Sequence, residues 1–180
     1  MNKKIWHQKL NIIHNKIPLL KRPYRPCVGL MVFNKDGNIF CGQRLDNKAE
    51  AWQLPQGGIN KGELPIEAGY RELKEETSIT NVEFMCEYPD WLNYDIPLPL
   101  ADNLWDGKYR GQKQRWLLFY FSGIDDEINI KTKNPEFKNW IWLNPSKLPE
   151  KAISFKKDVY NKINDIFIPI LDNFISSNIK

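Results

Sequence analysis

The sequence predicts one mixed α/β (α+β) domain. Several short segments are rich in β-branched and aromatic residues, two longer segments carry apolar residues at helical spacing, and loops of Pro, Gly, Asn and Asp separate them. The chain has 180 residues, of which 42% are hydrophobic, enough for one domain with a sizeable core. We assign residues 23–175 to this domain and residues 1–22 to an N-terminal extension.

The extension is set apart by Pro23 and Pro26, which break any helix that reaches them. Apolar residues recur before these prolines at roughly helical spacing: Ile5, Trp6, Leu10, Ile13 and Ile17. The pattern fits a short helix docked on the domain, and it fits a frayed extension equally well.

The domain begins with a predicted hairpin. The run CVGLMVF at 27–33 is rich in strand formers, the turn NKDGN closes it, and residues 38–43 form the return strand. WQLP at 52–55 predicts another short strand. The glycines that follow, Gly57, Gly58 and Gly62, predict a flexible loop whose backbone can approach a ligand closely.

Two helices are predicted, at 65–77 and 155–174. Pro65 suits the first turn of the first helix, whereas Pro169 is expected to kink or end the second. Residues 89–114, rich in Pro, Asp, Gly, Trp and Tyr, are expected to form a long irregular insertion, a feature that is usually functional. The remaining predicted strands are 82–88, 115–123 and 140–143.

Charge and cysteine content indicate the kind of partner and the cellular compartment. The net charge of +4 and the pI of about 8.8 suit an anionic partner such as a nucleotide or RNA. The three cysteines are widely spaced and odd in number, so they predict reduced thiols rather than disulfides or a zinc site. No apolar run has the length of a signal peptide core or a membrane span. We therefore expect a cytoplasmic protein without membrane contact, and a monomer is favoured.

The strongest chemical signal lies in the helix predicted at 65–77. At about 100° per residue, Glu72, Glu75 and Glu76 share one side of it. Three such carboxylates repel one another unless a divalent cation lies between them, and hard cations such as Mg²⁺ prefer oxygen ligands. The alternative is a solvated acidic face with Arg71 and Lys74 as local partners. The glycine-rich segment just upstream favours the cation.

The spacing from Gly57 to Ile79 resembles the Nudix box: Gly57, five residues, Glu63, seven residues, Arg71-Glu72-Leu73, one residue, Glu75-Glu76, one residue, Ser78, Ile79. Ser78 stands where the family has glycine, which suggests a different end to the helix. The resemblance implies a Nudix-type α/β/α sandwich with a mixed central sheet. It also implies a hydrolase of phosphoanhydride bonds that uses Mg²⁺, for which Mn²⁺ or another divalent cation can substitute.

The resemblance assigns roles to individual residues. The implied metal ligands are Glu72, Glu75, Glu76, Glu136 and a backbone carbonyl at Gly57 or the neighbouring Gln56. Glu63 and Arg71 would orient the carboxylates from behind. One carboxylate must accept a proton from the attacking water, and the candidates are Glu72 first and Glu136 second.

Further segments resemble the bacterial RNA 5′-pyrophosphohydrolases, close kin of dinucleoside polyphosphate hydrolases. The segments are YRPCVG at 24–29, AWQLPQGGIN at 51–60, GQKQRW at 111–116, NPEFKNWIW at 134–142 and SFKKDVY at 154–160. The implied donors to phosphate oxygens are Arg25, Arg44, Gln112, Lys113, Gln114 and Arg115. Ile153 and Phe155 would sandwich a base, with Lys156 beside it.

Three functions are weighed. The first is removal of pyrophosphate from the 5′-triphosphate end of RNA, which leaves monophosphate RNA and promotes mRNA decay. The second is the same chemistry on dinucleoside polyphosphates such as diadenosine tetra- or pentaphosphate. The third is a catalytically inactive Nudix module that binds RNA, against which the intact glutamates argue.

Overall fold

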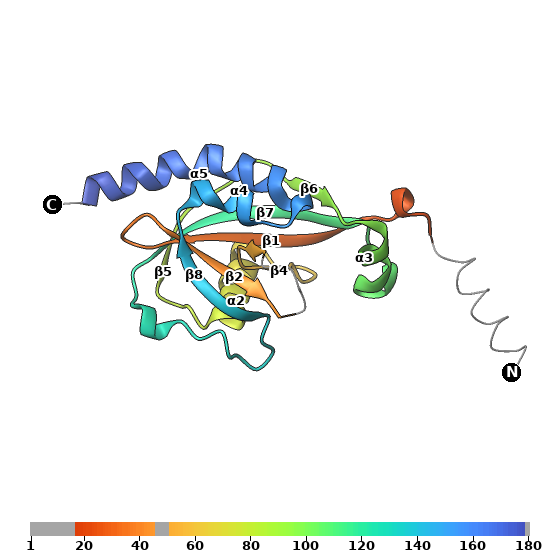
Figure 1. The fold of residues 1–180 in the computed structure, drawn as a ribbon, viewed down its shortest axis with the longest axis horizontal. Helices are drawn as coiled ribbons and strands as arrows, with labels where there is room; N and C mark the ends of the chain where they lie inside the picture. Colours follow the sequence, from red (N-terminus) through yellow and green to blue (C-terminus); the bar gives the residue numbers. More distant parts are fainter. Residues whose placement is uncertain (1–16, 46–50, 179–180) are drawn as a thin grey trace, which may run out of the picture.

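The computed structural model describes residues 17–45 and 51–178. A mixed sheet lies between two layers of helices (Figure 1). Helix α2 (Pro65–Thr77) packs on one face, and α4 (Leu148–Lys151) and α5 (Lys157–Asn178) pack on the other. The predicted α/β/α sandwich with a mixed central sheet is confirmed.

The sheet is built around a parallel pair of strands. Its strands are β1 (Tyr24–Phe33), β2 (Ile39–Arg44), β3 (Trp52–Gln53), β4 (Gln56–Gly58), β5 (Val82–Glu87), β6 (Leu92–Asp95), β7 (Gly111–Phe121) and β8 (Phe137–Leu143). The main order is β3-β2-β1-β7-β5, with β4 on β1, β6 on β7 and β8 on β2. Strands β1 and β7 run parallel from the Tyr24–Gly111 pair to the Phe33–Tyr120 pair, and the other pairings are antiparallel.

The central strands explain the strongest sequence signals. Residues 27–33 of β1 are all buried because the helices cover both faces of the sheet, which favours a continuous apolar run over alternation. On the α2 side, a Cβ on Gly69 would lie 2.6 Å from Cδ1 of Leu117. A side chain at Gly69 would therefore push the helix away from the sheet.

The prediction of an irregular insertion at 89–114 is wrong. This segment contains β6, helix α3 (Leu98–Asn103), the 3₁₀ turn η2 (Leu104–Gly107) and the start of β7. The alternation in β6 is regular, since Leu92 and Tyr94 are buried and Asn93 and Asp95 are exposed. The strand was missed because its pairing partner, the beginning of β7, lies at the far end of the same segment.

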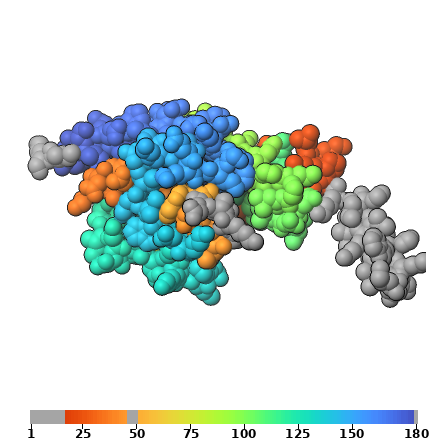
Figure 2. Space-filling view, viewed as in Figure 1, coloured from red at the N-terminus to blue at the C-terminus, as the bar shows by residue number. Residues whose placement is uncertain are grey.

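The α3–η2 segment projects at the surface beside the body of the domain, where it is drawn in green (Figure 2). Within it, Trp105 (φ 49°, ψ 38°) and Asp106 (φ 57°, ψ 27°) both adopt the left-handed conformation. Such a conformation costs a non-glycine residue about 1–3 kcal/mol. The partly buried ion pair between Arg22 and Asp102, with an N–O distance of 2.6 Å, connects this segment to the start of the described chain.

Two further expectations need correction. Gly57 and Gly58 do not form a flexible loop, because they lie in β4, where Gly57 pairs with Val28 and Gly58 with Cys27. Pro169 does not end the C-terminal helix, which continues to Asn178. Pro169 lies on the exposed side of α5, where the lost backbone hydrogen bond is best tolerated.

The N-terminal extension is described only from Ile17 onward. The 3₁₀ turn η1 (Leu19–Lys21) precedes β1, whereas most of the predicted N-terminal helix falls outside the described residues. Cys27, Cys41 and Cys86 are free thiols, as predicted. Among the residues described, no helix is long and apolar enough to cross a membrane. Smaller helical elements are η3 (Asp125–Glu127), η4 (Pro145–Lys147) and η5 (Ser154–Lys156).

Ser78 ends α2 in the left-handed conformation, with φ 63° and ψ 1°. We expect Ser78→Gly to raise the free energy of unfolding by about 0.5–1 kcal/mol. Glycine adopts this conformation without the steric cost of a Cβ, and this gain outweighs the greater entropy that glycine gives the unfolded chain. Urea denaturation measures the change. The control is Ser78→Ala, which keeps the strain. Both variants lose the hydrogen bond from Ser78 Oγ to the Asn129 carbonyl (3.1 Å), so the difference between them measures the strain. A glycine variant no more stable than the alanine variant would contradict this account.

Candidate functional site

Arg71 connects the acidic face of α2 to the segment before it. Its Nε and Nη2 donate to the two carboxylate oxygens of Glu63 at 2.7 and 2.8 Å, and Nη2 also donates to the Gly58 carbonyl at 2.8 Å. Its Nη1 donates to Glu72 Oε1 at 2.7 Å and lies 3.6 Å from Glu75 Oε2. The hydrogen bonds from Arg71 lower the pKa of Glu63 to about 2. Arg71 and Glu63 thus hold Glu72 from behind, the arrangement expected of orienting residues.

Glu76 is the most deeply buried acid of α2, with 3% of its surface exposed. Its Oε2 accepts a hydrogen bond from the backbone N–H of Gln56 at 3.2 Å, while Oε1 is buried without a hydrogen-bond partner. Burial raises the pKa of Glu76 well above its usual value, and the neighbouring carboxylates Glu136 and Glu72 raise it further. A buried, half-satisfied carboxylate of this kind favours a cation as the missing partner.

Glu72 lies directly against β4. A Cβ added to Gly57 would overlap the carboxylate of Glu72, so only glycine leaves room for that carboxylate. Burial raises the pKa of Glu72, and Arg71 opposes this shift. Because Gly57 has no side chain, the backbone of β4 and the carboxylate of Glu72 can lie in direct contact.

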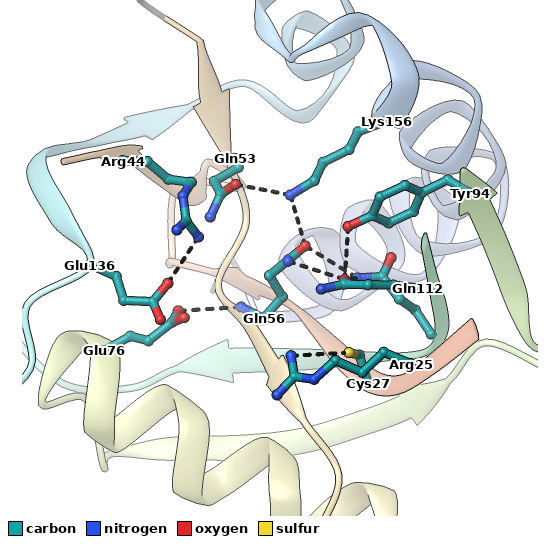
Figure 3. A network of polar contacts seen from close by, with 11 residues as sticks. Arg25, Cys27, Arg44, Gln53, Gln56, Glu76, Tyr94, Gln112, Glu136 and Lys156 are labelled. Atoms are coloured by element: carbon teal, nitrogen blue, oxygen red, sulfur yellow. Dashed lines mark hydrogen bonds and ion pairs between the residues drawn. The ribbon is translucent and has the colours of Figure 1, made fainter. Parts of the chain in front are cut away.

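Glu136 enters from the loop before β8 and lies beside Glu76 (Figure 3). Its Oε2 accepts from Arg44 Nη1 at 3.1 Å. Glu75 is also on the acidic face but its side chain is 61% exposed. The acids line a hollow of about 810 Å³. Across residues 17–45 and 51–178, no three His, Cys, Asp or Glu side chains are placed so that they could hold a metal ion. Glu72 and Glu136 are instead paired with Arg71 and Arg44.

The donor set nevertheless fits a divalent cation. All side-chain candidates are carboxylates, the ligands that hard cations prefer. Oε1 of Glu76 is buried without a hydrogen-bond partner, and burial, followed by repulsion from Glu136 and Glu72, raises the pKa of Glu76. A cation bound there would relieve both costs, once Glu72 and Glu136 turn away from Arg71 and Arg44.

A second hollow of about 360 Å³ adjoins the first, and Glu72 and Glu136 line both. Of the residues predicted to contact substrate, this cavity is lined by Arg25, Arg44, Gln112, Ile153, Phe155 and Lys156. Phe155 is stacked on Tyr94, with ring centroids 5.6 Å apart and an interplanar angle of 24°. The structure therefore places the predicted base-contacting residues next to the acidic cluster.

The floor of the cavity is a buried network of amides (Figure 3). Gln112 Oε1 accepts from Tyr94 Oη at 2.8 Å, from Gln114 Nε2 at 2.9 Å and from Gln56 Nε2 at 3.2 Å. Lys156 Nζ donates to Oε1 of Gln53 and of Gln56, both at 2.9 Å. Gln112 and Gln114 are thus engaged in holding the floor together, and Gln114 does not line the cavity.

Lys113 and Arg115 are not brought to the cavity. Successive side chains of a strand point to opposite faces, so in β7 these two lie on the α2 side while Gln112 and Gln114 lie on the α5 side. Both cations lie over the ring of Trp91, at 5.1 Å for Lys113 Nζ and 5.6 Å for Arg115 Cζ. The sequence motif GQKQRW predicts one group of donors, whereas β7 places Gln112 and Gln114 on one face of the sheet and Lys113 and Arg115 on the other.

Burial lowers the pKa of the Lys156 ammonium to about 7, with Arg44 contributing in the same direction. We therefore expect Lys156→Met to raise KM about tenfold at pH 6, where wild-type Lys156 is charged, and much less at pH 9, where it is neutral. The measurement is the ratio of the two KM values across pH, which cancels titration of the substrate. A ratio that does not change with pH would contradict the assignment.

The lowered pKa of Lys156 also makes the stability of the fold depend on pH. Because the folded pKa of Lys156 lies below the unfolded value, the folded state binds fewer protons, and wild-type stability rises with pH between about 7 and 10.5. Lys156→Met lacks this contribution. Compared with the wild type, the variant is therefore relatively most stable below pH 7.

Several cavity residues were missed by sequence reasoning. Tyr94, Gln53, Gln56 and Trp105 all line the cavity. Tyr94 and Trp105 belong to the segment that was read as irregular, and the alternation of LNYD was the available signal for the first. The local sequence does not show whether a glutamine such as Gln53 or Gln56 is buried in the floor of the cavity or exposed at the surface.

The model of the NUDIX domain family matches residues 23–163. The chain is 50% identical over 151 residues to a protein named RNA pyrophosphohydrolase from Roseobacter denitrificans, covering 83% of this chain and 94% of the relative. Proteins of the same name from Pelagibacter ubique and Wolbachia pipientis are 44% identical (88% and 98% covered) and 46% identical (86% and 96% covered).

Solved structures share the fold at lower identity. The E. coli dihydroneopterin triphosphate pyrophosphohydrolase superposes with a TM-score of 0.60 at 17% identity, covering 78% of this chain and 97% of that one. A C. elegans Ap4A hydrolase binary complex gives a TM-score of 0.55 at 18% identity, with 78% and 97% covered. From its matched domain, its close relatives and its fold, the chain belongs to the NUDIX domain family.

Proposed function

We propose that this protein removes pyrophosphate from the 5′-triphosphate end of RNA and leaves a 5′-monophosphate, which promotes mRNA decay. The observation that carries the proposal is that a hollow lined by acids and a cavity with an aromatic wall meet at Glu72 and Glu136. The first suits a polyphosphate accompanied by cations, and the second suits a base attached to it. The relatives named RNA pyrophosphohydrolase support the choice of RNA.

Nudix hydrolases generally use divalent metal ions, and we propose Mg²⁺, with Mn²⁺ able to substitute. The proposed ligands are Glu72, Glu75, Glu76, Glu136 and the backbone carbonyl of Gly57. A bound cation neutralises phosphate charge and lowers the pKa of water. Arg71 and Glu63 hold Glu72 in place for this task.

The chain's own residues supply the other functions. Arg25, Arg44 and Lys156 line the cavity and present positive charge to the phosphates. Phe155, with Ile153 nearby, provides a surface for the base. Glu72 or Glu136 accepts the proton of the attacking water, since both border the two hollows.

The decisive experiment compares kcat/KM for a triphosphorylated RNA oligomer and for diadenosine tetraphosphate under one Mg²⁺ condition. We expect the RNA to be the better substrate. A preference for the dinucleotide of more than about tenfold, or 1.4 kcal/mol in transition-state binding, would overturn the proposal in favour of dinucleoside polyphosphates. No hydrolysis of either would favour a binding module.

A further inference from the structure

The acidic hollow, which is the hollow of about 810 Å³ lined by the glutamates, continues the cavity beyond a narrow boundary. Glu72 and Glu136 line both spaces, whereas Lys74 and Lys133 line only the acidic hollow and Phe155 lines only the cavity. A polyphosphate attached to a base at Phe155 would therefore cross the boundary at the two glutamates. The phosphates beyond it, which include the leaving group, would extend into the acidic hollow.

The lining of the acidic hollow also contains positive charge. Four glutamates line it together with three basic side chains, those of Arg71, Lys74 and Lys133. As far as the structure describes the chain, the ion pairs of these glutamates are made by arginines, and neither lysine takes part in them. Both ammonium groups are therefore available to an anion in the hollow.

Lys133 is the more informative of the two lysines. A lysine in the last turn of a helix is stabilised by the helix dipole, and this alone accounts for Lys74 in α2. Lys133 lies in the loop between η3 and β8, which forms the part of the lining that does not come from α2. Its side chain is exposed, so the alternative is a solvated surface lysine. An anion held in the hollow explains why an unpaired lysine borders a cluster of carboxylates.

We propose that Lys133, assisted by Lys74, binds the pyrophosphate that leaves the RNA. The water oxygen bonds to the α-phosphorus, one of its protons passes to Glu72 or Glu136, and the other remains on that oxygen. The bond from the α-phosphorus to the oxygen that bridges the α- and β-phosphates breaks. Pyrophosphate departs with the bridging oxygen and with additional negative charge, which a nearby ammonium group stabilises. This inference rests on the proposed function and concerns the part of the substrate farthest from the base.

The site would favour a triphosphate end over a diphosphate end. Both ends have a phosphoanhydride bond that can lie at the boundary, but the leaving group of a diphosphate is a single phosphate. That group carries less charge and extends less far into the acidic hollow. Because Lys74 and Lys133 line the acidic hollow and not the cavity, we expect them to contribute more to the longer leaving group.

The experiment uses the full chain in Mg²⁺ with inorganic pyrophosphate as the probe. Lys133→Met removes the charge and keeps a side chain of similar length. It is expected to raise the dissociation constant of pyrophosphate, measured by titration calorimetry, about fivefold, the upper range for one exposed charge pair. The inhibition constant of pyrophosphate against a triphosphorylated oligonucleotide should rise equally, while that of AMP should stay within about twofold. Lys133→Arg is expected to recover most of the loss.

The choice of substrate gives a second readout. In Lys133→Met, kcat/KM should fall about fivefold for the triphosphorylated oligonucleotide and less than about twofold for its diphosphorylated form. The matched control is Lys131→Met, which removes the same charge from the same loop. Lys131 is exposed and lines neither the acidic hollow nor the cavity. It should therefore change neither pyrophosphate binding nor the preference between the two ends.

The outcomes separate the inference from its foundation. Pyrophosphate binding that is unchanged in Lys133→Met would overturn the inference. Equal effects of Lys131→Met and Lys133→Met would do so as well, by showing that only the net charge of the loop matters. Equal losses on triphosphate and diphosphate ends would also count against it, because Lys133 would then act at the boundary. A wild type that binds pyrophosphate through Lys133 but hydrolyses neither oligonucleotide would instead refute the proposed function and support the pyrophosphate site.

Discussion

Glu76→Gln is expected to lower kcat/KM for triphosphorylated RNA about 10³-fold, equivalent to roughly 4 kcal/mol of transition-state stabilisation. The amide is nearly the same size, so the fold is kept, but it binds a divalent cation poorly. Because Glu76 is buried with Oε1 unpartnered and interacts with both Glu136 and Glu72, its loss affects the proposed ligand set.

The same substitution is expected to stabilise the metal-free protein. The pKa of Glu76 is raised in the folded state, so the folded protein holds more protons than the unfolded chain, and stability falls as pH rises from about 4.5 through the raised value. Glu76→Gln does not titrate and escapes this loss. Its advantage over the wild type should be small below pH 4.5 and should grow as the pH rises.

Activity assays and thermal denaturation with and without Mg²⁺ test both effects. Mg²⁺ should raise the Tm of the wild type and leave that of Glu76→Gln nearly unchanged, since only a bound ligand stabilises the folded state. Glu83→Gln, on the exposed edge of β5, is the control and should resemble the wild type throughout. Undiminished hydrolysis by Glu76→Gln would refute the metal site.

Gly57→Ala is expected to lower kcat/KM by about 10²-fold while changing the free energy of unfolding little. The new Cβ would occupy the space of the Glu72 carboxylate. A flexible side chain can turn away at low energetic cost, so the fold survives, but the carboxylate then lies outside the acidic cluster. Displacing a catalytic group by about 1 Å is enough for a loss of this size.

Gly62→Ala is the contrasting control. Its Cβ would meet no atom within 4 Å, but its φ of +84° disfavours any side chain. We expect this variant to lose about 1 kcal/mol of stability and to keep its activity in the folded state. Kinetic assays and urea denaturation of both variants test the pattern, which would be contradicted if Gly57→Ala retained full activity.

The acidic cluster was predictable from sequence, because helical spacing is local. Glu72 and Glu76 share a side of α2 wherever the helix packs, and Gly57 precedes them in a motif of fixed spacing. Glu136 required the family resemblance, since only the tertiary fold brings it beside Glu76. Six of the eight strands of the sheet were also predicted, with ends that differ by up to four residues, whereas β4 and β6 were not.

The walls of the cavity were less accessible to sequence reasoning. The period of two in β7 was available in GQKQRW, yet the motif was read as one cluster, and so Lys113 and Arg115 were placed with Gln112. Trp105 depends on a left-handed turn in which Trp105 and Asp106 share the positive φ of Gly107, and the glycine alone does not predict the conformation of the two residues before it. Such features arise from long-range contacts, which a local pattern does not encode.

The parallel pairing of β1 with β7 also has a consequence for the order in which the protein forms. Residues 34–110 separate the two strands, so β1 leaves the ribosome long before its central partner exists. At ordinary rates of translation this interval is on the order of ten seconds. During it the apolar run at 27–33 can pack only against earlier elements such as β2, β4 and α2, and contacts of high sequence separation form slowly. Newly made chains of this protein should therefore depend on chaperones until residue 121 has emerged.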